Sequence, residues 1–151
     1  MKVFKFSGTS NNMYGTYRNE FSGYFIKQVN DEIIGTMHGE EGDAFIKGLF
    51  INNSQLIFIE MTTIKNGIYG YSFNNINEVG LYDICDWLSG LFSGELERIE
   101  ARIKIEETAD FDGMNKEIEK NFQSFYESLD DWEKYYFEHV QKLREYLDIA
   151  D

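Results

Sequence analysis

Short apolar runs separated by turn-forming residues fill the first two-thirds of the chain. Apolar and polar positions alternate in "KVFKFSG" and again in "RIEARIKIEE", the period-two pattern of a strand with one wet face. Between them, "EFSGYFIKQV" and "EIIGTMHG" flank Asn30-Asp31, and "DAFIKGLFI" and "QLIFIEMTT" flank Asn52-Asn53-Ser54. Both pairs predict β-hairpins. The regular spacing of strand and turn predicts an antiparallel meander within residues 1–107.

Glycine interrupts four of these runs near their centres, at Gly23, Gly35, Gly48 and Gly70. Because glycine weakens a strand by roughly 0.5–1 kcal/mol relative to alanine, its repeated use needs a reason. If neighbouring strands align, the four positions form a diagonal band at which a sheet bends. We therefore expect a curved sheet or a small barrel; the alternative is that each glycine makes room for an aromatic ring.

Residues 74–94 fit two interpretations. Apolar side chains at 76, 79, 84, 88 and 91 have the spacing of a helical face, whereas those at 81, 87 and 92, set between glycines, fit another pair of strands. Both alternatives stay open at the level of sequence.

The last part of the chain has a helical pattern over residues 113–149. Large apolar residues recur alternately four and three positions apart and form what we call the seam. Its members are Ile118, Phe122, Phe125, Leu129, Trp132, Tyr136, His139, Leu143 and Tyr146. A single helix here would be about 50 Å long, whereas Ser128-x-x-Asp131 has the spacing of a cap that would start a second helix. We expect an α+β chain in which residues 108–151, as one amphipathic helix or a helical hairpin, pack on the sheet in a single domain.

The strand-rich part resembles the calycin-like antiparallel barrels, the relatives of lipocalins and avidins. The resemblance covers residues 2–107 and rests on aromatic-x-Gly-aromatic strands such as "FSGYF" and on "GLYDICDW" before the final strand. It implies an up-and-down barrel and assigns no ligand residue. A hollow interior would make the protein a small-molecule carrier, with Phe25, Phe45, Phe58 and Tyr69 lining the cavity.

The charge of the chain is strongly negative. Twenty-seven acidic residues stand against fourteen basic ones, for a formal charge of −13, and seventeen of the acidic residues lie within 95–151. Such a field repels nucleic acids and anionic membranes and attracts basic partners. We therefore expect a protein partner with a basic surface, and no direct binding to nucleic acid or membrane. The absence of proline, with plentiful Asn, Ile, Lys, Phe and Tyr, is typical of an AT-rich bacterial or phage genome.

Two short segments contain residues of the types that bind metals or act in catalysis. "HGEEGD" gathers His38, Glu40, Glu41 and Asp43, but its spacing matches neither an EF-hand nor a zinc site, and a polar turn explains it. "YDICDW" surrounds Cys85 with two aspartates and carries no nucleophile signature. We expect no metal and no cofactor.

The cysteine count and the lack of catalytic motifs point to a non-enzymatic protein of the cytoplasm. A lone cysteine excludes an internal disulfide and fits a reducing compartment, and "MKVFKFSGTS" lacks the apolar stretch of a secretory signal. The chain contains no phosphate-binding loop, no GxSxG and no CxxC.

The function that the sequence favours is an acidic protein-binding module. In size, charge and lack of motifs the chain is similar to small inhibitors such as bacterial immunity proteins and phage anti-defence proteins. Its carboxylates would compete with phosphate for Lys and Arg on a nucleic-acid-binding partner. The expected contact residues lie opposite the seam: Glu133, Phe137, Glu138, Glu145 and Asp148. The alternatives are the small-molecule carrier and a homodimer that pairs through the seam, residues 118–146.

Overall fold

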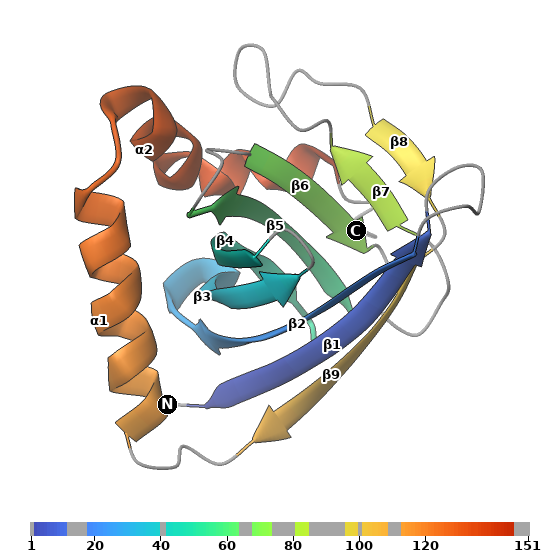
Figure 1. Ribbon diagram of the computed structural model, residues 1–151, viewed down its shortest axis with the longest axis horizontal. Coiled ribbons are helices and arrows are strands. Elements are labelled where there is room, and N and C mark those ends of the chain that lie inside the picture. Colours follow the sequence, from blue (N-terminus) through green and yellow to red (C-terminus); the bar gives the residue numbers. More distant parts are fainter. Residues whose placement is uncertain are drawn as a thin grey trace.

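The computed structural model describes residues 2–11, 18–39, 42–63, 68–73, 81–84, 96–99, 101–108 and 113–146. In these ranges an antiparallel sheet is followed by helices, which confirms the α+β class (Figure 1). The strands are β1 (Val3–Asn11), β2 (Arg18–Lys27), β3 (Glu32–Gly39), β4 (Gly42–Ile51), β5 (Gln55–Thr62), β6 (Ile68–Phe73), β7 (Leu81–Ile84), β8 (Leu96–Ile99) and β9 (Ala101–Thr108). The helices are η1 (Val29–Asp31), α1 (Met114–Glu127), α2 (Asp131–Glu138) and η3 (Val140–Tyr146), where η marks a 3₁₀ segment.

The two hairpins expected from the sequence are confirmed. β2 pairs with β3 around the Asn30-Asp31 turn, and β4 pairs with β5 around Asn52-Asn53. All four turn residues have positive φ, between 52° and 65°. Asn and Asp adopt this left-handed conformation at lower cost than other side chains, because their short polar groups bond to the local backbone.

The strand order returns on itself. Each strand from β1 to β7 pairs with the next one in the chain, so β8 is one edge of the sheet, and β9 pairs with β1 at the other edge. Yet β8 ends at Ile99 and β9 begins at Ala101, so one residue joins the two edges. The sheet is therefore curled into a half-barrel, in agreement with the expected curvature (Figure 1).

Three of the four glycines explain this curl. Gly23, Gly35 and Gly48 share the concave face, and each is displaced diagonally from the one on the neighbouring strand. A Cβ added at any of them would lie 2.0–2.1 Å from a carbonyl oxygen of the adjacent strand. An aromatic ring tip is also close at Gly23 alone. Close approach of the backbone, more than room for rings, is the reason for glycine here. Gly70 lies on the opposite face, beside Ile68 in the alternation of β6.

The concave face is packed with aromatic rings. Its buried members are Phe4, Phe6, Phe21, Phe25, Ile33, Met37, Ile46, Phe50, Leu56, Phe58, Tyr71 and Phe73. The rings of Phe4 and Phe25 stack with centroids 5.2 Å apart, and those of Phe58 and Tyr71 stack at 5.1 Å. Ile103 and Ile105 of β9 pack against this cluster from the edge.

The convex face is covered by the helices, so the sheet is buried on both sides where they lie. Aliphatic residues from β1 to β6 form this second cluster with Ile118, Phe122, Tyr136, Phe137, Val140 and Leu143. α1 runs along one side of the sheet, α2 follows at the upper end of α1, and the red segment after α2 passes behind β6 (Figure 1). Phe45 of β4 stacks on Phe125 of α1 with ring centroids 4.3 Å apart. The helices are thus part of the core.

The helical region is broken into two helices, as the helical-hairpin alternative predicts. The second helix, however, does not start at the residue that the sequence indicated. Ser128 is the C-cap of α1, and Asp130, rather than Ser128, is the N-cap of α2. The break resets the helical phase, so the seam is continuous only through its first part. Trp132, assigned to the seam, is 55% exposed, whereas Phe137, assigned to the opposite face, is fully buried. Both assignments were wrong because they assumed one uninterrupted helical period.

Three further expectations concern residues 74–94, the seam as a dimer interface and the membrane. β7 shows that residues 81–84 are a strand, while the rest of 74–94 lies outside the described residues. The buried seam residues pack against their own sheet, so they do not present an apolar stripe to a second copy. No helix in the described ranges has the length and hydropathy needed to cross a membrane.

Candidate functional site

α2 is capped at its start by a contact with Asp130, the residue before the helix. Glu133, the third residue of the helix, accepts a hydrogen bond on its Oε1 from the backbone N–H of Asp130 at 3.0 Å. This contact satisfies a donor that the helix start would otherwise leave to solvent. At the other end, the Nδ1–H of His139 donates to the carbonyl oxygen of Tyr135 at 2.8 Å. The short helix is therefore fixed at both ends.

Two large aromatic side chains of α2 face solvent. Among the described residues, the large apolar side chains that are exposed are Val29 at 77%, Trp132 at 55% and Tyr135 at 41%. Asp131, Trp132, Tyr135 and Tyr136 line a hollow of about 400 Å³. We call these four residues the aromatic patch. Most of the aromatic side chains that the structure describes are buried, and an exposed cluster of rings is then the usual mark of a contact surface.

The rings of the patch support one another. Tyr135 and Tyr136 meet edge to face with centroids 6.2 Å apart, and the ring of His139 lies 4.3 Å from that of Tyr135. Tyr136 is buried at the base, and this burial raises its pKa. The patch therefore rests on the core.

Carboxylates flank the aromatic patch. Asp131 lines the hollow itself, and Glu138 is exposed three residues beyond Tyr135, on the same side of the helix. The Tyr126 hydroxyl donates to Oε1 of Glu138 at 2.5 Å, which holds this carboxylate at the junction of α1 and α2. That hydrogen bond raises the pKa of Tyr126 to about 12. Rings bordered by carboxylates suit arginine and lysine, which bind both.

Of the contact residues expected from the sequence, Phe137 does not lie on the surface. Phe137 is fully buried in the core and is corrected to a structural residue. Glu133 caps α2, Glu138 bonds to Tyr126, and Glu145 is exposed on η3. Asp148 lies outside the described residues.

The residues expected to line a barrel cavity include one, Phe45, that lies on the other face of the sheet. Phe25 and Phe58 are fully buried among the rings of the concave face. Phe45 points to the other face, where it packs on α1. The backbone of Tyr69 pairs with Glu60, but its side chain is outside the description. Phe45 therefore shares no cavity with Phe25 and Phe58.

The side chains at the two ends of the "HGEEGD" loop are in contact. Nδ1 of His38 lies 2.5 Å from Oδ1 of Asp43, across the end of the β3–β4 hairpin. Glu40, Glu41 and Cys85 lie outside the described residues. Within the described ranges, His, Cys, Asp and Glu form no group of three that could hold a metal ion.

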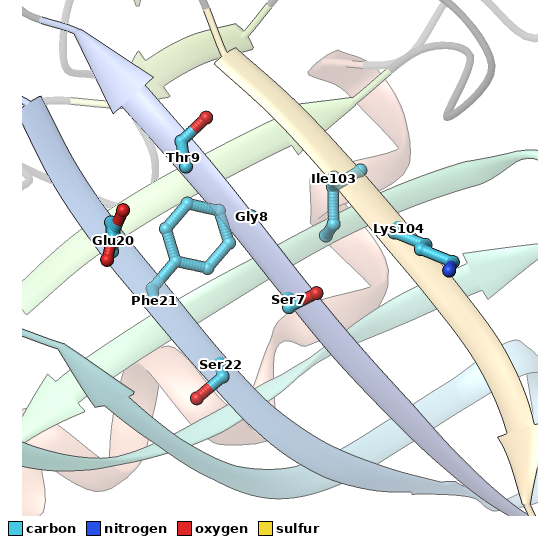
Figure 2. A pocket seen from close by; sticks show the side chains of 8 residues that line it. All are labelled: Ser7, Gly8, Thr9, Glu20, Phe21, Ser22, Ile103 and Lys104. Atoms are coloured by element: carbon cyan, nitrogen blue, oxygen red, sulfur yellow. The ribbon is translucent and has the colours of Figure 1, made fainter.

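A second hollow, of about 460 Å³, lies on the wall of the half-barrel (Figure 2). Three adjacent strands line it: Ser7, Gly8 and Thr9 from β1, Glu20, Phe21 and Ser22 from β2, and Ile103 and Lys104 from β9. Gly8 stands opposite both Phe21 and Ile103 in the pairing registers. Because Gly8 has no side chain, space is left between its two neighbouring strands. The buried Phe21 makes the lining of this hollow partly apolar.

The aromatic patch has a sequence signal that the seam conceals. Asp130 followed three residues later by Glu133 is a helix-start pattern. A helix started there buries Tyr136, Phe137, Val140 and Leu143, at steps of one, three and three, and leaves Trp132 and Tyr135 to the side.

Comparison with known proteins gives no relative. No family model matches the chain, and neither do any curated protein or any solved structure. The curled sheet agrees with the barrel-like fold that the calycin resemblance implies, but membership of that family is not established.

Proposed function

We propose that this protein is a non-enzymatic, cytoplasmic protein-binding module whose contact surface is the aromatic patch on α2. The observation that carries the proposal is the exposure of Trp132 and Tyr135 on a helix capped at both ends. Rigid, exposed Trp and Tyr side chains supply much of the binding energy of protein interfaces, since they lose little conformational freedom on binding.

The partner we propose has a basic surface. Asp131 and Glu138 border the rings, and the chain as a whole has a formal charge of −13. Arginine side chains of a partner would stack on Trp132 and pair with these carboxylates. A protein that covers the basic surface of a nucleic-acid-handling partner would act as an inhibitor by competing with phosphate. The long-range negative field would speed the encounter.

Native mass spectrometry of the protein purified from its own host tests this proposal. We expect a complex with a basic protein that weakens as salt rises, because charge attraction is screened. The double variant Trp132→Ala/Tyr135→Ala should lose the complex. Val29→Ala, at the other described large and exposed apolar side chain, should keep it. A complex that both variants retain, or the absence of a basic partner in low salt, would overturn the proposal.

A further inference from the structure

A groove of about 530 Å³ lies between α1 and the sheet, away from the aromatic patch. Its lining comes from four elements or their ends: Gln28, Ile34, Lys47, Lys116, Glu119, Lys120, Phe122, Gln123 and Tyr126. Ile34 and Lys47 stand directly opposite each other in the β3–β4 register, so the floor is fixed by the sheet. The volume is within the range of small-molecule sites, roughly 300–1,000 Å³.

Three of the nine lining residues are lysines, in a chain with fourteen basic and twenty-seven acidic residues. Lys116 and Lys120 are one turn apart on α1, where like charges oppose helix formation. Among the described residues, neither forms an ion pair. Glu119 is the one carboxylate in the lining, so the groove has an excess of positive charge.

Lys47 is the most enclosed of the three cations. Its side chain is 19% exposed, and its Nζ is 3.6 Å from Oε1 of Glu32. The other oxygen of Glu32 accepts a hydrogen bond from Nε2 of Gln141 at 2.9 Å. Glu32 is therefore shared between two elements, and its contact with Lys47, which lines the groove, is longer than a normal hydrogen bond.

The rest of the lining is apolar or amide. Ile34 and Phe122 are buried and make the base of the groove apolar, and the half-buried Tyr126 also lines it. Gln28 and Gln123 add side-chain amides, which both donate and accept hydrogen bonds. A ligand that fits has an anionic group for the lysines and a flat, polar-edged body for the aromatic and amide side chains.

We infer that this groove binds a phosphorylated small molecule of nucleotide size. Its phosphate contacts Lys47, Lys116 and Lys120, which bind phosphate as point charges. Its ring lies against the half-buried Tyr126, above the apolar base of the groove. The site is distinct from the aromatic patch and does not depend on the proposed protein partner.

Titration of the protein with AMP, followed by amide NMR shifts, tests the inference. We expect saturable shifts confined to residues around the groove. The variant Lys116→Gln/Lys120→Gln removes two exposed lysines and should weaken AMP binding about tenfold or more. Lys2→Gln/Lys142→Gln makes the same change in net charge outside the groove and should leave AMP binding within about twofold.

Three results would overturn the inference. The first is the absence of saturable shifts with AMP up to about 10 mM, which is weaker than specific recognition provides. The second is equal weakening in both double variants, because that result would mean non-specific charge attraction. The third is binding of inorganic phosphate alone as tight as that of AMP, because the apolar floor would then contribute nothing. A thermal melt of each variant confirms that it is folded before titration.

Discussion

The guanidinium of Arg144 donates to Oδ2 of Asp31 at 3.1 Å, although 113 residues separate the two in the chain. The same Nη2 donates to the carbonyl oxygen of Asn30 at 3.1 Å, and the Nε donates to Oε1 of Gln141. Gln141 in turn donates to the Asn30 carbonyl. This polar network ties η3 to the turn between β2 and β3 and so fixes the C-terminal helices on the convex face.

Replacing Arg144 with alanine should destabilise the fold by about 1 kcal/mol, because it removes three hydrogen bonds from a network that is partly screened by water. Urea denaturation measures the free energy of unfolding. Lys142→Ala, an exposed position on the same segment, should change it by less than about 0.5 kcal/mol. Equal effects of the two substitutions would mean that the network does not hold η3.

Replacing Gly48 with alanine should destabilise the fold by about 3 kcal/mol or more, since its Cβ would lie 2.0 Å from the carbonyl oxygen of Ile57. The neighbouring strand must move to remove this overlap. Thermal or urea denaturation gives the difference from the wild-type protein.

Gly113→Ala is the matched control. An added Cβ there meets nothing within 4 Å, but φ is +73°, so only backbone strain of about 1 kcal/mol is expected. A smaller loss at Gly48 than at Gly113 would contradict the crowding explanation of the curl.

Phe137→Ala and Trp132→Ala should differ sharply in stability. Phe137 is fully buried against the sheet, so its removal should cost about 3–5 kcal/mol. Trp132 is 55% exposed, and its removal should cost less than about 1 kcal/mol. A larger loss of stability in Trp132→Ala than in Phe137→Ala would support a single helix with an uninterrupted seam. Denaturant melts of the two variants distinguish these results.

The stability of the α1–α2 junction should depend on alkaline pH. The hydrogen bond to Glu138 raises the pKa of Tyr126 to about 12, so the fold favours the protonated phenol. Its contribution to stability is complete below about pH 10, the pKa of an unfolded tyrosine. It is lost as pH rises toward 12.

Ultraviolet titration of tyrosinate checks this pKa, with Tyr126→Phe identifying the signal. In Glu138→Gln, the pKa of Tyr126 should fall toward its ordinary value, because the charged acceptor is gone. An unchanged pKa in Glu138→Gln would mean that burial, not the hydrogen bond, is the main cause.

The sheet could be predicted from the sequence because its signals are local. Alternation within each strand and the turn residues at Asn30-Asp31 and Asn52-Asn53 specify both hairpins. The diagonal of Gly23, Gly35 and Gly48 also follows once these hairpins are in register. The atom that each glycine makes room for is a carbonyl oxygen of the neighbouring strand. The residue pattern does not predict how closely that oxygen approaches.

The helical surface was predicted less well. A heptad pattern continues through Trp132 in the sequence, and only the cap at Asp130 indicates that the helical phase restarts. The lysine groove could not be predicted, because Lys47 comes from β4 and Lys116 and Lys120 come from α1. The one-turn spacing of Lys116 and Lys120 predicts that they share a face of the helix. It does not predict which strand lies opposite that face.

The pairing of β1 on both of its edges has a consequence for the order in which the chain folds. Val3 opposes Ile26 on one side and Thr108 on the other, whereas the other described strand pairs join successive segments. During synthesis each strand from β2 to β5 can pair with the strand made just before it. The second edge of β1 stays unpaired until β9 has been made. Closing a longer loop costs only about 0.6 kcal/mol for each doubling of its length, yet it slows folding. An incomplete chain released before residue 101 would therefore expose the edge of β1 to strands of other molecules, a starting point for aggregation.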